Sequence, residues 1–109
     1  MNEEDAAKLF HALSNPDRLR VIRALVVAGP EGLSAGEIGA AVNASPSRAS
    51  FHLATLADAG FLTRRRNARS LVYAVDFNRI GGLLGFMVHD CCKGHPTIEA
   101  CCTGAASSD

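Results

Sequence analysis

Two adjacent pairs of cysteines, Cys91–Cys92 and Cys101–Cys102, lie close to the C-terminal end of this 109-residue chain. Thiolates are soft ligands that select thiophilic ions, and trivalent arsenic or antimony takes three of them. Gly94 and Pro96 lie between the pairs and favour a turn, so that the second pair can fold back towards the first. The pattern therefore favours a thiolate site for arsenite or antimonite.

The same cysteines allow three other interpretations. Low-pKa thiols beside Lys93 would oxidise, which makes a redox or persulfide switch with a disulfide between the pairs an alternative. Four cysteines can also close a zinc site, although structural zinc usually takes pairs separated by two to four residues. His95 is the best extra ligand if the ion is divalent. In the third interpretation the thiols are buried or idle.

Composition excludes several classes of protein. No apolar run approaches the ~20 residues of a membrane span, and the start MNEEDAAKLF is acidic and lacks the features of a secretory signal. We therefore expect a cytoplasmic protein without a membrane partner, whose thiols stay reduced. The chain has no C-x-x-C, P-loop or Gly-rich nucleotide motif, so we expect neither an enzyme nor an organic cofactor.

Helical periodicity dominates the first sixty residues. Glu3–Leu13 forms a first helix, and Asn15 and Pro16 start a second one that runs to about Ala28, with Leu19, Ile22, Ala24, Leu25 and Val26 as its apolar positions. Ser34 and Glu37 form a capping box for a third helix. Ser45 and Pro46 begin a fourth, which ends at Gly60 and turns Ala49, Leu53 and Leu56 inward.

After Gly60 the apolar period changes to two, which predicts strands at 61–66 and 71–75 that form one hairpin. Asp76 then caps a last helix. The fold class is therefore mainly α with a β-hairpin, a winged helix-turn-helix. We expect residues 1–90 to form a DNA-binding and dimerisation domain and residues 91–109 a cysteine-rich tail, disordered from Thr103 onwards.

Lys plus Arg and Asp plus Glu both number eleven, so only the distribution of charge can favour nucleic acid. Five arginines lie between Arg48 and Arg69, against the single acid Asp58. A helix with small polar side chains outward fits the major groove of DNA, and an arginine-bearing hairpin reaches the flanking phosphates. The expected DNA-binding residues of the helix and the hairpin are Ser45, Ser47, Arg48, Ser50, His52, Arg64, Arg66 and Arg69.

Residues 9–74 resemble the ArsR–SmtB family of metal-sensing repressors, through LFHALSNPDRLRVIRAL, SAGEIGAAVNASPSRASFHLATLADAGFL and RRRNARSLVYAV. The resemblance implies a homodimer built on the first and last helices, which binds an inverted-repeat operator and leaves it when an inducer binds. Ser47, Arg48, Ser50 and His52 match recognition-helix positions, and Arg66 and Arg69 match the wing. The expected dimer-interface residues are Leu9, Ile80, Leu83, Leu84 and Met87.

One departure from the family concerns the inducer site. Members that bind arsenic on the third helix have cysteines there, whereas this chain has Ser34–Glu37. A last-helix zinc site would retain Asp76 and His89 but lacks the remaining ligands. The cysteines instead resemble those of members with an adjacent pair after the last helix and one more in the tail, which implies arsenite sensing. A protein-interaction module is the alternative of a different class, and steep salt dependence of operator binding would distinguish a repressor from it.

Overall fold

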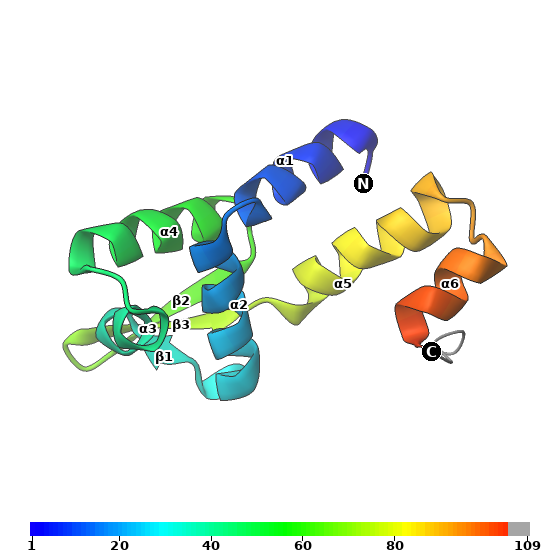
Figure 1. Cartoon of the computed structure of the whole chain (residues 1–109). Helices are drawn as coiled ribbons and strands as arrows, with labels where there is room; N and C mark the ends of the chain where they lie inside the picture. The colour runs from blue at the N-terminus through cyan, green and yellow to red at the C-terminus, as the bar shows by residue number, and fades with distance from the viewer. Residues whose placement is uncertain (105–109) are drawn as a thin grey trace.

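The computed structural model describes residues 1–104, in which helices surround a small sheet (Figure 1). The expected order of four helices, a hairpin and a further helix is confirmed, with a short strand and a C-terminal helix added to it. In chain order the elements are α1 (Glu3–Leu13), α2 (Pro16–Ala28), the 3-10 turn η1 (Gly29–Glu31), β1 (Leu33–Ser34), α3 (Ala35–Val42), α4 (Pro46–Asp58), β2 (Leu62–Asn67), β3 (Ser70–Val75), α5 (Phe77–Gly85), the π-helical turn η2 (Phe86–Cys91) and α6 (Pro96–Thr103).

The helices start where capping side chains satisfy the first free N–H groups. The caps of α2, α3, α4 and α5 are the expected ones: Asn15, Ser34, Ser45 and Asp76. Ser34 and Glu37 form the reciprocal capping box, in which the Glu37 carboxylate accepts from the Ser34 N–H at 2.8 Å. This local chemistry fixes the start of α3 directly after β1.

The sheet has three antiparallel strands in the order β1-β3-β2, one more than the hairpin predicted from the sequence. Leu33 lies opposite Tyr73, and the backbone at Gly32 (φ +72°) approaches so closely that a Cβ there would collide with the Tyr73 carbonyl oxygen. A two-residue strand has no periodicity to detect, which is why it escaped prediction. The hairpin turn is also tighter than expected, because Asn67 pairs with Ser70.

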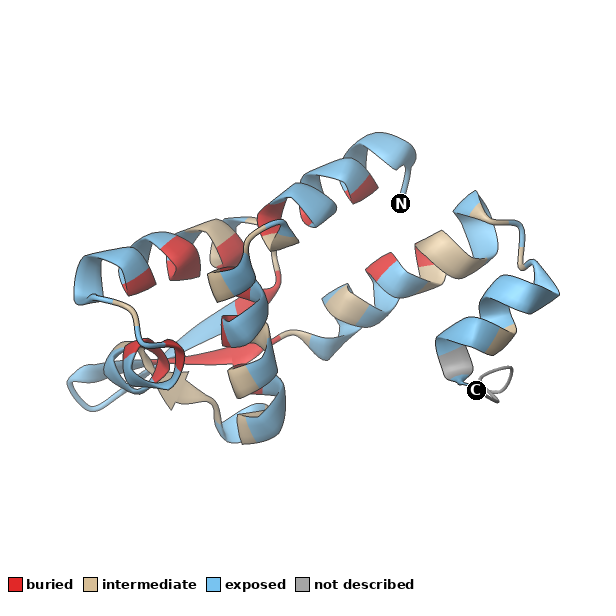
Figure 2. Cartoon of the chain, viewed as in Figure 1, coloured by how far each residue is buried: buried red, intermediate tan, exposed pale blue. Residues whose placement is uncertain are grey.

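The core lies where α2, α3 and α4 meet the sheet (Figure 2). Its fully buried side chains include Leu25, Ile38, Leu53, Leu56 and Phe61. The inward face assigned to α2 is partly wrong, because Leu19 and Val26 are 53% and 43% exposed while Val21 is buried. The real inward positions are 18, 21 and 25, and position 18 is an arginine, which an apolar pattern does not reveal.

Beyond the sheet, α5 extends into η2, and α6 then turns back beside α5 (Figure 1). The turn between η2 and α6 uses positive φ at Lys93 and Gly94, close to the expected reversal. The tail was expected to be disordered from Thr103, whereas α6 extends to that residue; the rest of that expectation falls on residues 105–109, outside the described part of the chain. Among residues 1–104, no helix has the length and apolar character needed to cross a bilayer.

Candidate nucleic-acid interface and thiol segment

The outward face of α4 carries mostly small side chains. Ala49, Leu53 and Leu56 turn into the core as expected, and the positions opposite them are exposed. The exposed residues of α4 and its cap are Ser45, Pro46, Ser47, Arg48, Ser50, Phe51, Ala54 and Asp58. Because these side chains are mostly small, the backbone of α4 can come close to the floor of a groove.

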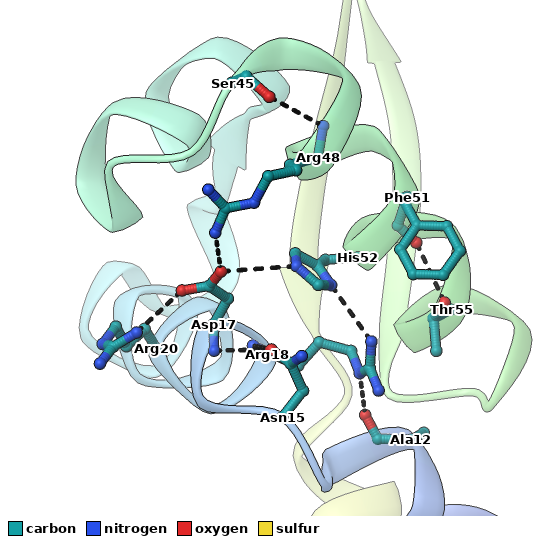
Figure 3. A network of polar contacts seen from close by, with 10 residues as sticks. All are labelled: Ala12, Asn15, Asp17, Arg18, Arg20, Ser45, Arg48, Phe51, His52 and Thr55. Atoms are coloured by element: carbon teal, nitrogen blue, oxygen red, sulfur yellow. Dashed lines mark hydrogen bonds and ion pairs between the residues drawn. The ribbon is translucent and has the colours of Figure 1, made fainter.

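His52 does not lie on that face, so its expected exposure is wrong. Only 6% of the residue is exposed. Its Nδ1 lies 3.2 Å from Nη1 of Arg18, which is itself buried and donates through Nε to the carbonyl oxygen of Ala12 at 2.6 Å (Figure 3). His52 therefore links α4 to α2 and, through Arg18, to the end of α1. It lies on the inward side of α4, away from the exposed face.

Arg48 points back to α2 in the DNA-free protein. Its Nη2 pairs with Oδ2 of Asp17, whose other oxygen accepts from Arg20 Nη1 at 2.8 Å (Figure 3). The Nε2 of His52 lies 3.7 Å from the same Oδ2. The hydrogen bond from Arg48, followed by the charges of Arg48 and Arg20, holds the pKa of Asp17 below its usual value. The Asp17 carboxylate thus restrains Arg48, the arginine of α4.

The hairpin divides its arginines between two tasks. Arg65 donates to the carbonyl oxygens of Pro30 and Glu31, at 3.4 Å and 3.0 Å, and so fastens β2 to the η1 turn. Arg64, Arg66 and Arg69 are exposed. Because neighbouring positions of a strand face opposite sides, Arg64 and Arg66 point away from that turn. Their contact with DNA stays a prediction.

The expected dimer-interface residues fall into two groups. Leu9 and Leu83 are 5% and 2% exposed within one chain and belong to its own core. No partner is needed to bury these two side chains. Ile80 and Met87 are half-buried, and Leu84 is 50% exposed. Of the expected interface residues, Leu84 is therefore the most exposed in the single chain, and the contact of these residues with a partner stays a prediction.

The first cysteine pair lies at the C-terminal end of the π-helical turn η2. Cys91 is exposed and Cys92 is half-buried. Burial raises the pKa of the Cys92 thiol, and the hydrogen bond and charge of the adjoining Cys91 raise it further. The expectation of low-pKa thiols beside Lys93 is therefore wrong for Cys92, whose pKa is raised and not lowered.

The second pair occupies the last turn of α6, where Cys101 and Cys102 are both exposed. Cys102 lines a groove of about 200 Å³ between α5 and α6, together with Leu84, Val88, His89 and Glu99. His89 Nδ1 lies 3.7 Å from Glu99 Oε2 across this groove. Within residues 1–104, no three His, Cys, Asp or Glu side chains gather as metal ligands, so the four thiols are not assembled into a preformed site.

Two candidate ligands of a divalent ion, His95 and Asp76, already cap helices. The Nδ1 of His95 accepts from the Thr97 N–H at 3.2 Å and caps α6. The Asp76 carboxylate accepts from the N–H groups of Asn78 and Arg79 and caps α5. His89 is exposed, as expected. Metal binding through Nε2 of His95 would move the ring proton to Nδ1 and break its cap, whereas Asp76 caps through Oδ1 alone.

Two residues of the candidate interface were missed in the sequence. Phe51 is 64% exposed on the outward face of α4, and its position four residues after Ser47 already placed it opposite Leu53 and Leu56. Asp17 was assigned only to the helix dipole, whereas it also accepts from Arg48. No spacing rule links positions 31 residues apart, so that contact needed the fold.

Comparison with known proteins shows what the chain is similar to. Residues 13–65 match a family model described as a helix-turn-helix domain. An HTH-type transcriptional regulator of Bacillus subtilis, YceK, is 41% identical over 63% of this chain and 68% of its own. The HTH-type transcriptional regulator YgaV of Escherichia coli is 30% identical over 82% and 88%. A "Probable mercury resistance operon repressor" of Streptomyces lividans is 30% identical over 74% and 62%.

Two solved structures of transcriptional regulators are also similar to this chain. A "Possible transcriptional regulator for arsenical resistance" is 25% identical, with a TM-score of 0.65 over 73% of this chain and 80% of its own. The homodimeric winged helix-turn-helix domain Mb0332 of Mycobacterium bovis, a possible ArsR-family regulator, is 21% identical, with a TM-score of 0.64 over 84% and 85%. At that identity the likeness to Mb0332 concerns the fold alone.

Proposed function

This chain belongs to the HTH-type transcriptional regulators and has the winged fold of ArsR-family regulators, and we propose from this that it is a homodimeric repressor induced by trivalent arsenic or antimony. Its relatives and its fold are those of DNA-binding regulators rather than of enzymes. In the proposal the protein acts in the cytoplasm, where thiols stay reduced. The site residues are those of α4, the hairpin, α5 and the two cysteine pairs.

The DNA-binding part of the proposal rests on α4 and the hairpin. The N-terminal turn of α4 presents the small residues Ser45 and Ser47, which can approach base edges in a major groove. Arg66 and Arg69 reach the flanking phosphates. Two copies of α4 must lie about 34–36 Å apart to enter successive major grooves, so the operator is an inverted repeat and binding depends on the dimer.

The inducer part rests on one observation, which is the placement of two thiol pairs at the ends of one short helical hairpin. Cys91 and Cys92 end η2, and Cys101 and Cys102 end α6. Cysteine thiolates are the type of ligand that trivalent arsenic and antimony bind, and the four thiols exceed the three that such an ion takes. Because the described residues do not gather three thiols together, binding requires α6 to move or thiols from both protomers to combine.

Release of DNA follows from the position of α6. A helix of eight residues is marginal on its own, so α6 can unwind at small cost and bring Cys101 towards Cys91 and Cys92. That movement opens the groove that α6 forms with Leu84 of α5. Since Leu84 is the exposed centre of the proposed dimer surface, a shift there changes the spacing of the two α4 helices.

A mercuric ion is the second candidate inducer. The relative from Streptomyces lividans is named a "Probable mercury resistance operon repressor", and a pair of thiols such as Cys91 and Cys92 also suits a thiophilic divalent ion. A redox or persulfide switch is the third candidate. The raised pKa of the Cys92 thiol disfavours rapid oxidation at that position, because the thiolate is the reactive form.

A DNA-release titration on reduced protein tests the proposal. Arsenite, antimonite, mercuric chloride, zinc chloride and hydrogen peroxide are each added to the complex with the DNA that precedes the protein's own gene. Release by arsenite or antimonite at concentrations at which zinc and peroxide have no effect supports the proposal. Release by peroxide alone establishes the redox switch, and release by mercuric chloride alone establishes a mercury sensor.

A further inference from the structure

Phe51 is the one large apolar side chain on the outward face of α4, and 64% of it is exposed. We propose that Phe51 is a specificity-determining residue that contacts the 5-methyl group of thymine in the operator. The proposal rests on the DNA-binding function inferred above. It goes beyond that function because it names the base and the chemical group that the helix reads.

The position of Phe51 along the helix supports this role. Ser47, Phe51 and Ala54 follow one another at intervals of four and three residues, which places them on a single line of the helix surface. The residues before and after the ring along this line are therefore small. On a helix lying in the major groove, the ring would project beyond these small side chains towards the base edges.

The Phe51 ring also contacts one neighbouring ring. It contacts the imidazole of His52 edge to face, with centroids 5.7 Å apart and planes at 61°. His52 is itself buried and linked to Arg18 (Figure 3). The backbone beneath the ring is helical, and the Phe51 carbonyl oxygen accepts from the Thr55 hydroxyl at 3.1 Å. The ring therefore has one packing contact, with a buried side chain, on the side away from the outward face.

The chemistry of the major groove then selects the partner of the ring. Hydrogen-bond donors and acceptors line that groove, and the thymine methyl is the apolar group among them, which apolar side chains contact. Phe51 carries no donor or acceptor, so it cannot read the polar edges of guanine, adenine or cytosine. The neighbouring arginine and serines supply the polar contacts, whereas Phe51 supplies an apolar one.

Uracil substitution tests this inference, because uracil is thymine without the methyl group. Wild-type protein first selects its site from a random duplex pool, and each thymine of the selected site is then replaced by uracil. At the contacted thymine of each half-site, the wild-type affinity should fall about fourfold, the factor that the burial of one CH₂ is worth. Substitution in both half-sites should give about a 15-fold loss.

Variants assign the effect to the ring. Phe51→Ala should bind thymine and uracil duplexes with equal affinity, and Phe51→Leu should retain part of the difference. Val27→Ala removes another exposed apolar side chain, on α2, and should keep the wild-type difference.

Three outcomes would overturn the inference. A selected site without thymine in its half-sites is the first, and the same uracil effect in wild type and Phe51→Ala is the second. The third is Phe51→Ala with unchanged operator affinity, which would place the ring outside the operator contacts. In all three the wild type still binds DNA, so the repressor proposal survives. Failure of the wild type to select any DNA would instead refute that proposal and the inference together.

Discussion

The Nη1 of Arg18 donates to Nδ1 of His52 across 3.2 Å, and both residues are buried. A guanidinium has only donors, so Nδ1 of His52 must accept and the ring proton must lie on Nε2, which faces Asp17. This contact joins α2 to the back of α4. It places a histidine expected at the DNA surface inside the protein, where it holds α4 in position.

Replacement of His52 by alanine should destabilise the fold. The change leaves Nη1 of Arg18 buried without its acceptor, which costs about 1–3 kcal/mol. Urea denaturation should show a free energy of unfolding lowered by that amount. Ser50→Ala, at an exposed position of the same helix, should change stability by less than about 0.5 kcal/mol. If the two variants are equally stable and only His52→Ala loses operator affinity, His52 contacts DNA directly.

Replacement of Asp17 by asparagine should reduce stability in a pH-dependent way. The folded-state pKa of Asp17 is lowered by Arg48 and then Arg20, so its contribution is fully present above its usual value of 3.8. The contribution is lost as the pH falls through the lowered pKa. The melting temperature of Asp17→Asn should therefore lie below that of wild type at pH 7, and the two should converge once the pH has fallen below the lowered pKa of Asp17. A constant difference across this range would show that the ion pairs contribute nothing.

Arg66 and Arg65 are adjacent in β2 but should differ in their contribution to DNA binding. If Arg66 contacts one phosphate, Arg66→Ala should reduce the slope of log affinity against log salt by about one unit per contact. Arg65→Ala is the matched control, because its guanidinium binds the carbonyls of Pro30 and Glu31. Equal slopes for the two variants would remove Arg66 from the DNA interface.

Leu84→Glu should convert the protein into monomers that lose operator affinity. The side chain is 50% exposed on α5, so a carboxylate there leaves the single chain intact but cannot be buried in a dimer. Light scattering after size exclusion measures the change. Val27→Glu, at an 82% exposed position of α2, should stay dimeric. A Leu84→Glu dimer with wild-type affinity would place the interface elsewhere.

Most of the fold was predictable from local signals. Caps such as Asn15, Ser34 and Asp76 act within a few residues of the chain, and the change of period after Gly60 marks the hairpin. Strand β1 was missed because it exists only through its pairing with β3. Helix α6 was missed because its eight residues contain mixed polar and apolar positions and two cysteines.

The candidate site was less predictable, because its contacts join distant parts of the sequence. Arg18 and His52 lie 34 positions apart, and a buried histidine and an exposed one have the same sequence signature. Phe51 was overlooked because an aromatic residue is expected in a core. The cysteines were found from composition alone, but their separation on η2 and α6 depends on a helix that the sequence did not reveal.

Arsenite titration of operator complexes shows whether the C-terminal thiols couple trivalent arsenic to DNA release. Fluorescence anisotropy of labelled operator follows the release from reduced wild type, Cys92→Ser, Cys102→Ser and a variant with all four cysteines changed to serine. We predict about a 5–150-fold loss of wild-type affinity, the range of a coupling of about 1–3 kcal/mol. Cys92→Ser should bind operator but stay bound in arsenite, whereas Cys102→Ser should retain most of the response. Release of the four-serine variant by arsenite would contradict the account.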